Sequence, residues 1–145
     1  MSEGQETFIK RRCSFTNCYV STNRQLFGDV ADFDVILFHG RELPGRTSLL
    51  PQSRSPHQKY IYTNMESSAR FPVCNKIYNN GYFNWTMTYK LDSDEYFGYF
   101  SIRDKEGKVI GPKKEMHWVK LEAMMPINDT LKAKLSTKKI AAAWF

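Results

Sequence analysis

The chain has 145 residues, a mass of 17.0 kDa and a formal net charge of +6, with 41% hydrophobic and 25% charged residues. This length suits one domain with its own core rather than two full domains, and the composition is that of a globular protein. The sequence holds no apolar run long enough to cross a bilayer, and its polar residues 1–12 have no apolar stretch typical of a signal peptide.

The positive charge is concentrated near the carboxyl terminus. Residues 1–50 contain equal numbers of basic and acidic side chains, whereas residues 111–145 contain seven Lys or Arg and three Asp or Glu. Most of the lysines from Lys132 onward decorate an expected helix and its exit, which is typical of a solvated helix face. Nucleic-acid binding is therefore the less favoured alternative, and it would predict strongly salt-dependent RNA binding.

The cysteines and histidines do not form a recognisable metal motif. Cys13 and Cys18 have no second ligand pair at a suitable spacing, and the three histidines are scattered singly. We therefore expect no metal site. Two Asn-x-Thr triplets, at Asn84 and Asn128, are candidate N-glycosylation sites that would matter only in a secretory compartment.

The first half of the chain predicts two strands that end in polar residues. A short strand over 16–20 and a short helix capped by Thr22 come first, because Gln25 could complete a capping box. The apolar, β-branched run 33–38 then predicts a buried parallel strand. A second strand is expected over 58–65, after a loop rich in Ser, Pro and Arg.

The second half predicts a further strand, a hairpin and a helix. Residues 83–89 have strand composition, and segments 96–102 and 108–110 could pair across a turn that contains Gly107. A helix is expected from 126–128 to about Ser136, with Leu131 and Leu135 on one face. Strands separated by helices and loops indicate an open α/β sheet whose ligands bind beyond the carboxyl edge.

Glu66 is the best single candidate for chemistry. It follows the aromatic strand residues Tyr60-Ile61-Tyr62, where a partly desolvated carboxylate would suit general-base work. The alternative is a surface glutamate that caps the next loop. His39 and Arg41 follow the neighbouring strand and could flank the same crevice, although His39 could equally be structural.

The tripeptide Asp92-Ser93-Asp94 has the Asp-x-Asp form that can hold a divalent metal. Asp and Ser are also favoured turn residues, and a turn is the simpler interpretation.

Several motifs follow one another at characteristic spacings along the chain. They are Ala31-Asp32, Val35 to Glu42, Arg54, Pro56, Gln58, Tyr60 to Ser67, Phe83 to Tyr89 and Asp92 to Asp94. In order and spacing this set resembles the acceptor domain of the α-1,3-fucosyltransferases, with the arthropod Golgi members most similar, and the likeness runs from about Cys13 to Phe145.

The resemblance implies a Rossmann-like N-terminal lobe of a two-lobed, GT-B type glycosyltransferase. Residues 1–12 would be a polar segment, 13–139 the acceptor domain and 140–145 the start of a C-terminal donor domain. The donor substrate, GDP-fucose, would be held mainly by that second lobe, and this chain would hold no cofactor. The full-length protein would be a type II membrane protein of the Golgi lumen.

The resemblance also assigns roles to residues. Glu66 matches the general base that takes the proton from a GlcNAc hydroxyl of the acceptor glycan, and transfer would invert the configuration at fucose. Tyr62, which stands where the family usually has Trp, would stack on an acceptor sugar. Asn64, His39 and Arg41 would also contact the acceptor.

The remaining implications concern the cysteines, the metal and the acceptor. Cys13 and Cys18 resemble family cysteines that form disulfides, some with the second lobe. The Asp92 to Asp94 match belongs to a family motif that does not clamp a metal. Ser68, Lys90-Leu91 and Gly98-Tyr99-Phe100 depart from the family pattern and leave acceptor specificity open. The alternative function is an inactive lobe that at most binds glycans.

Overall fold

The computed structural model describes residues 3–43, 48 and 50–140. The chain divides into two units, residues 1–112 and residues 113–145, and each is described by itself. The expected start of a donor domain at 140–145 falls almost entirely outside the described residues.

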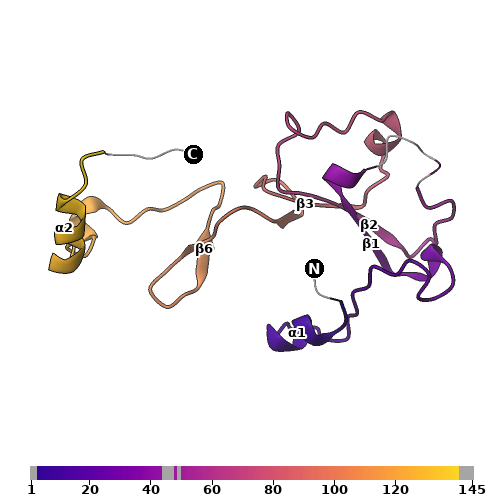
Figure 1. The fold of residues 1–145 in the computed structure, drawn as a ribbon, viewed down its shortest axis with the longest axis horizontal. Coiled ribbons are helices and arrows are strands. Elements are labelled where there is room, and N and C mark those ends of the chain that lie inside the picture. The colour runs from indigo at the N-terminus through magenta and orange to yellow at the C-terminus, as the bar shows by residue number, and fades with distance from the viewer. Residues whose placement is uncertain (1–2, 44–47, 49, 141–145) are drawn as a thin grey trace. The chain divides into compact units, whose positions relative to one another are not determined.

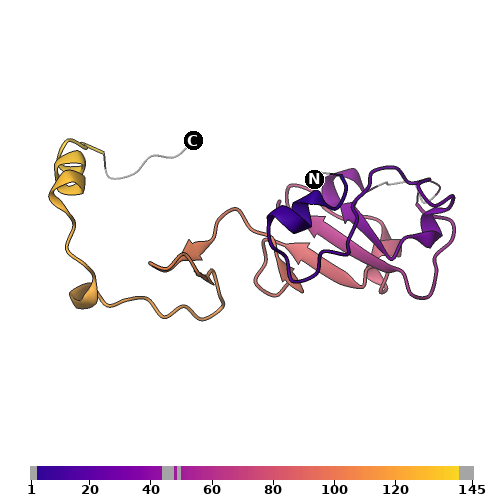
Figure 2. The same cartoon turned by 90° about the horizontal axis from the view of Figure 1, so that it is seen from below.

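The larger unit is built on a parallel four-stranded sheet, drawn from two directions in Figures 1 and 2. Its order is β1-β2-β3-β4, and all neighbouring strands are parallel. The register places His39 opposite Thr63 and Asn64 opposite Thr88. The strands are β1 (Val35–His39), β2 (Lys59–Asn64), β3 (Trp85–Thr88) and β4 (Glu95–Tyr96). This confirms an α/β sheet with strands in the regions predicted at 33–38, 58–65 and 83–89.

The connection before β2, which was predicted to be a loop, and the connection before β3 contain 3-10 turns and no α-helix within their described residues: η2 (Gly40–Glu42) follows β1, and η4 (Lys76–Asn79) lies between β2 and β3. A further 3-10 turn, η1 (Val30–Asp32), precedes β1. The physical reason lies in composition, because the connections are rich in Ser, Pro, Asn and Gly, which favour turns over helices.

An aromatic cluster covers one face of the sheet. Tyr60 is only 2% exposed, and its ring lies 4.9 Å from that of Phe38 and 5.2 Å from that of Tyr82. Phe83 packs edge-on to Tyr82, and the Tyr78 ring adds a further edge contact to Tyr82. Tilted and edge-to-face rings at these separations attract each other beyond the burial of their surface. The cluster holds the β2–β3 connection onto the sheet.

Arg54 clamps the amino ends of β2 and β3 together. Its guanidinium lies 3.9 Å from the centre of the Tyr60 ring and donates hydrogen bonds to the carbonyl oxygens of Tyr82, at 2.9 Å, and Gln58, at 3.2 Å. It also donates to Oδ1 of Asn84, and the same oxygen accepts the Tyr60 backbone N–H at 2.8 Å. A planar guanidinium can stack and donate in this way at once, whereas an ammonium group cannot.

Gln58 attaches β2 to the segment before β1. Its side chain is 1% exposed, and its amide nitrogen donates to the carbonyl oxygens of Val30, at 2.7 Å, and Phe33, at 2.8 Å. Buried polar groups need such partners, so this amide fixes how the turn at η1 meets the sheet.

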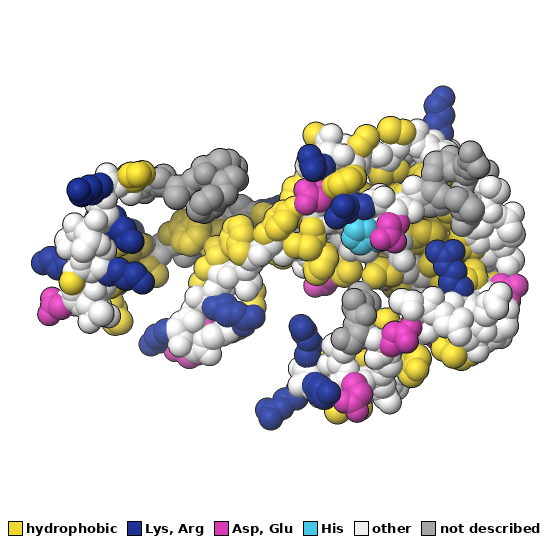
Figure 3. Space-filling model, in the orientation of Figure 1, with side chains coloured by type: hydrophobic (Ala, Val, Ile, Leu, Met, Phe, Trp, Pro, Cys, Tyr) yellow, Lys and Arg dark blue, Asp and Glu magenta, His cyan; other side chains and the backbone are white. Residues whose placement is uncertain are grey.

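The opposite face of the sheet is partly open in the described part of the chain. Val35, Leu37 and Trp85 are 44%, 39% and 45% exposed, and hydrophobic side chains reach the surface of this unit in Figure 3. The prediction that 33–38 is a buried strand is therefore wrong in burial, although right in pairing. Alternate residues of β1 point to opposite faces, and only Ile36 and Phe38 point toward covered surface.

The N-terminal region also differs from the expectation. Residues 16–20 form no strand, and only an isolated bridge joins Gly4 to Val20. Thr22 caps no helix, because its hydroxyl and backbone N–H both donate to the Glu3 carboxylate, at 2.6 and 2.8 Å. These hydrogen bonds lower the pKa of Glu3. A short helix, α1 (Glu6–Lys10), occupies the segment expected to be only polar.

The predicted hairpin is confirmed with shorter strands. β5 (Ile102–Arg103) pairs antiparallel with β6 (Val109–Gly111). Asp104 Oδ1 accepts the Lys108 backbone N–H at 2.8 Å, and Gly107 supplies a φ of +82° that other residues rarely adopt. Tyr96, expected at the start of this hairpin, belongs to β4 of the main sheet.

The smaller unit contains η5 (Leu121–Ala123) and α2 (Asp129–Ser136). The helix lies where it was predicted. Asn128 caps its amino end, because its side-chain oxygen accepts the Leu131 backbone N–H at 2.8 Å. Leu131 and Leu135 are 45% and 49% exposed. No helix among the described residues is long and apolar enough to cross a membrane.

The clamp predicts that Arg54→Lys lowers the free energy of unfolding of the larger unit by about 1–2 kcal/mol, because lysine keeps the charge but loses the planar fork. Urea unfolding followed by near-ultraviolet circular dichroism measures the change. Arg11→Lys, at an exposed position, is the matched control. Equal stability of the two variants would contradict the clamp.

The aromatic cluster predicts a loss of stability at high pH. Burial, with smaller contributions from Tyr60 and Tyr78, raises the pKa of Tyr82 from 10.0 to about 12, although Arg54 opposes the shift. Between these two values the unfolded chain releases the proton while the folded chain keeps it, so the free energy of unfolding falls as pH rises. Urea unfolding of Tyr82→Phe should show a shallower fall across pH 10–12 than the unchanged chain, and an identical slope would contradict the assignment.

Candidate functional site

The carboxyl edge of the sheet gathers the polar side chains of interest. Parallel strands end on the same side, so the residues after β1, β2 and β4 meet there. Glu66 lies two residues beyond β2, Arg41 lies two beyond β1, and Tyr99 lies three beyond β4.

Asn64 holds the backbone of Glu66 in place. Its Oδ1 accepts the Glu66 backbone N–H at 3.0 Å, and its amide nitrogen donates to the Tyr62 hydroxyl at 3.2 Å. Such a bond to the N–H two residues along is a turn typical of Asn. The side chain is 2% exposed, so the role visible in the structure is to position Glu66. Acceptor binding by Asn64 stays a prediction.

Gly40 lies close to the side chains of Tyr62 and Asn64 and leaves no room for a side chain of its own. A Cβ atom at this position would lie 2.7 Å from the Tyr62 hydroxyl oxygen and 2.8 Å from the Asn64 amide nitrogen. Both separations are too short for a carbon atom, so a side chain at residue 40 would displace Tyr62 or Asn64. The glycine after β1 therefore sets the position of the turn that carries Glu66.

Tyr99 is 63% exposed and interacts electrostatically with the half-buried Glu66. Desolvation of the hydroxyl raises the pKa of Tyr99, and the hydrogen bond to Glu66 raises it further. A phenol that keeps its proton donates to the carboxylate. The sequence analysis named Tyr99 only as a departure from the family pattern. No local signal could have linked it to Glu66, because the pairing depends on how β2 and β4 are placed.

Tyr62 is half-buried and packs inside the unit. Its ring lies 5.4 Å from that of Phe83, and its hydroxyl is occupied by Asn64. Part of the ring remains exposed, so stacking on a sugar stays a prediction.

His39 and Arg41 do not line one crevice as expected. His39 is exposed and lies on the same face of β1 as Leu37, whereas the side chains of Tyr62 and Asn64 lie on the other face of the sheet. Arg41 instead lines a pocket of about 230 Å³ that does not include His39. Two residues apart on a strand share a face, but the 3-10 turn at η2 redirects the chain between them.

The Asp92 to Asp94 segment acts as a turn between β3 and β4. Asp94 Oδ2 accepts the Thr86 backbone N–H at 2.7 Å and its hydroxyl at 2.9 Å, and these bonds lower the pKa of Asp94. Asp92 lies 3.6 Å from Lys90. Both carboxylates thus have local partners, which supports the turn interpretation. Among the described residues no group of three or more His, Cys, Asp or Glu could hold a metal ion.

The modification candidates lie in different settings. Cys13 and Cys18 are free and exposed, so their predicted disulfides stay predictions. Asn128 caps α2 through its side-chain oxygen, while the side-chain oxygen of Asn84 accepts from Tyr60 and Arg54. Glycosylation at either position also stays a prediction.

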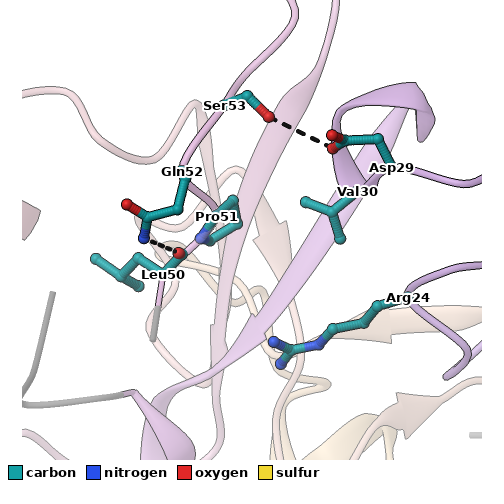
Figure 4. Close-up of a pocket in the computed structure, with 7 residues that line it drawn as sticks. All are labelled: Arg24, Asp29, Val30, Leu50, Pro51, Gln52 and Ser53. Carbon is teal, nitrogen blue, oxygen red and sulfur yellow. Dashed lines mark hydrogen bonds between the residues drawn. The ribbon is translucent and has the colours of Figure 1, made fainter. Parts of the chain in front are cut away.

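A second pocket, of about 290 Å³, is lined by residues that precede the strands in the chain rather than by residues that follow them. Figure 4 shows Asp29 joined to Ser53 and Gln52 joined to the Leu50 carbonyl, with Arg24 reaching in from another segment. Its residues precede β1 and β2, and ligands of open α/β sheets bind at the other edge. We therefore do not place the site there.

Comparison with known proteins identifies the family. The family model described as fucosyltransferase, N-terminal, matches residues 2–100. The chain belongs to this fucosyltransferase family. Those residues include all four strands of the sheet and the Glu66, Arg41 and Tyr99 positions at its carboxyl edge.

Individual relatives agree with the family assignment. This fucosyltransferase-family chain is 31% identical to alpha-(1,3)-fucosyltransferase C of Drosophila melanogaster over 97% of its length, which is 33% of that relative. It is 35% identical to alpha-(1,3)-fucosyltransferase 7 of Mus musculus, in a match that covers 66% of this chain and 24% of that relative. It is 33% identical to mouse 4-galactosyl-N-acetylglucosaminide 3-alpha-L-fucosyltransferase 9 over 61% of its length, or 25% of the relative. The chain thus spans a third or less of these proteins.

The turn predicts that Asn64→Ala lowers the free energy of unfolding by about 1–3 kcal/mol, because it removes the acceptor of the Glu66 N–H. Thermal and urea unfolding measure this change. Asn79→Ala, at an exposed position, is the control and should have little effect. An unchanged stability of Asn64→Ala would show that this turn does not hold Glu66.

Proposed function

We propose that this chain is the acceptor-binding lobe of an inverting α-1,3-fucosyltransferase, with Glu66 as the general base. The observation that carries the proposal is a half-buried glutamate just beyond the carboxyl end of a parallel strand, whose backbone N–H is held by Asn64, in a chain of the fucosyltransferase family.

The chemistry requires such a group. The hydroxyl of a GlcNAc residue is a weak nucleophile, and a positioned carboxylate takes its proton as the oxygen attacks the fucose carbon. Attack from the side opposite the nucleotide inverts that carbon through an oxocarbenium-like transition state. The fixed turn at Asn64 reduces the freedom of Glu66, which favours a productive geometry.

Tyr99 is a positioning residue in this proposal. Its protonated hydroxyl would donate to one oxygen of the Glu66 carboxylate and leave the other for the acceptor proton, in keeping with the raised pKa of Tyr99. Tyr62, Asn64, His39 and Arg41 are the proposed acceptor contacts. Of these, Arg41 lines a pocket, while His39 would reach an acceptor from the other face of the sheet.

The remaining parts of the proposal follow from the resemblance to α-1,3-fucosyltransferases. The lobe would act in a GT-B type enzyme whose second lobe binds GDP-fucose, and the full-length protein would be a type II membrane protein of the Golgi lumen. The relatives' greater length supports the presence of further functional parts in such enzymes. The alternative is a lobe that binds glycans without catalysis.

In the protein that includes a donor-binding lobe, Glu66→Gln should lower kcat about 10²–10⁴-fold with a smaller change in the acceptor KM, because glutamine keeps the shape but cannot take a proton. Fucose transfer to N-acetyllactosamine measures both constants. Glu106→Gln, at an exposed hairpin position, is the matched control.

Two outcomes would separate the possibilities. Undiminished transfer by Glu66→Gln would remove Glu66 from the mechanism. Calorimetry on the 145-residue chain should detect N-acetyllactosamine but no tight binding of GDP-fucose, and tight binding of the nucleotide sugar would contradict the lobe assignment.

A further inference from the structure

The Tyr62 hydroxyl is the acceptor for a buried amide. Asn64 is 2% exposed, and its amide nitrogen donates to the Tyr62 hydroxyl oxygen at 3.2 Å. Both residues lie on the same face of β2, because alternate side chains of a strand point to the same side. A buried N–H group that loses its acceptor costs free energy, so the hydroxyl is what makes this position of the amide favourable.

The oxygen of the same amide holds the candidate base. Asn64 Oδ1 accepts the Glu66 backbone N–H at 3.0 Å. The amide oxygen and nitrogen belong to one planar group, so a side chain that is bonded at both atoms has a fixed orientation. The Tyr62 hydroxyl, the Asn64 amide and the Glu66 N–H thus form one continuous chain of hydrogen bonds.

The backbone of Gly40 covers this chain of hydrogen bonds on the β1 side. His39 lies opposite Thr63 in the register, so the next residue of β1 comes beside Asn64. A Cβ atom on Gly40 would lie 2.7 Å from the Tyr62 hydroxyl oxygen and 2.8 Å from the Asn64 amide nitrogen. These are the two atoms of a single hydrogen bond, so a side chain at residue 40 would push them apart.

The hydroxyl gives residue 62 a property that an aromatic ring alone does not have. A phenol oxygen can accept a hydrogen bond, whereas the N–H of a tryptophan ring can only donate one. Trp, the usual residue of the family according to the resemblance, could therefore stack on a sugar but could not accept from the Asn64 nitrogen. The contact is thus separate from the stacking role that the resemblance predicts for Tyr62.

We propose that Tyr62 is a positioning residue for the general base. Its hydroxyl acts through Asn64 to fix the turn that carries Glu66, and a fixed carboxylate raises the rate of proton transfer from the acceptor sugar. This rests on the proposed function, because it takes Glu66 as the base. Stacking of the Tyr62 ring would change the affinity for the sugar instead, so the two roles separate in kcat and KM.

Hydrogen exchange of single backbone amides, followed by NMR on the 145-residue chain, tests the contact without any need for activity. Tyr62→Phe should make the Glu66 N–H exchange about tenfold faster, because the Asn64 amide loses its acceptor. The Asn84 N–H, which donates to the Tyr60 carbonyl oxygen at 2.8 Å, is the internal reference and should keep its rate. Equal acceleration of both amides would show a general loss of stability and would overturn the proposal.

A double-mutant cycle assigns the effect to the amide. In the Asn64→Ala background, Tyr62→Phe should not accelerate exchange of the Glu66 N–H any further, because the connection is already lost. Gly40→Ala should accelerate exchange as Tyr62→Phe does. Tyr19→Phe removes a hydroxyl from a side chain that is 65% exposed and is the matched control, with no change expected. Additive effects of Tyr62→Phe and Asn64→Ala would mean that the two side chains act independently, against the proposal.

Kinetics test the consequence for transfer in the protein that includes a donor-binding lobe. Tyr62→Phe should lower kcat about tenfold with little change in the acceptor KM, because the ring remains and only the hydroxyl is lost. Tyr19→Phe should leave both constants unchanged. A higher acceptor KM with an unchanged kcat would place the hydroxyl on the sugar and overturn the positioning role.

The results separate this inference from the proposed function. If Glu66→Gln lowers kcat but Tyr62→Phe does not, or if Tyr62→Phe leaves the exchange of the Glu66 N–H unchanged, the positioning role is overturned while Glu66 stands as the base. If Glu66→Gln transfers fucose undiminished, the proposed function itself fails, and the positioning role in catalysis fails with it.

Discussion

The hydrogen bonds of Arg54 are the constraint on which the rest of the sheet-bearing unit depends. One guanidinium stacks on Tyr60 and donates to groups on both sides of it, so the loop before β2 and the loop before β3 are fixed at the same end of the sheet. Parallel strands have no tight turn to set their register, and long connections must do so. Because the amino ends are held, the carboxyl ends are aligned, and Glu66 lies at the same edge of the sheet as the residues after β1 and β4.

The carboxyl edge shows how short-range contacts produce a site from a loosely structured connection. The residues between β2 and β3 form bends, turns and one 3-10 turn, yet Asn64 and Gly40 place the first of them within narrow limits. Asn64 uses its oxygen on the Glu66 N–H, and the missing side chain of Gly40 lets β1 approach. Rigid placement of a carboxylate is what general-base catalysis needs, since misplacement by even about 1 Å is costly.

The carboxyl edge also brings Arg41 and Arg70 to one aromatic ring. Arg41 follows β1 and Arg70 follows β2 by way of the Ser67 turn, so the two cations come from neighbouring strand exits. Phe71 then supports both. The opposite face of the sheet also carries charge, because the register places Lys59 and Glu95 on the same face as the exposed Val35 and Trp85.

Sequence reasoning predicted three strands of the main sheet, the hairpin and the helix α2, because each depends on a local pattern: runs with strand composition, a Gly at positive φ, and apolar residues four positions apart. It was wrong about 16–20 and the Thr22 helix, since the Thr22 hydroxyl bonds to the distant Glu3 instead of its own turn. It could not find the Tyr99 contact, the pairing of Arg41 with Arg70 or the separation of His39 from Arg41. The sequence alone determined which segments can become strands and which family they belong to, whereas the tertiary structure decided which side chains meet, because such contacts depend on strand order and register that no local pattern encodes.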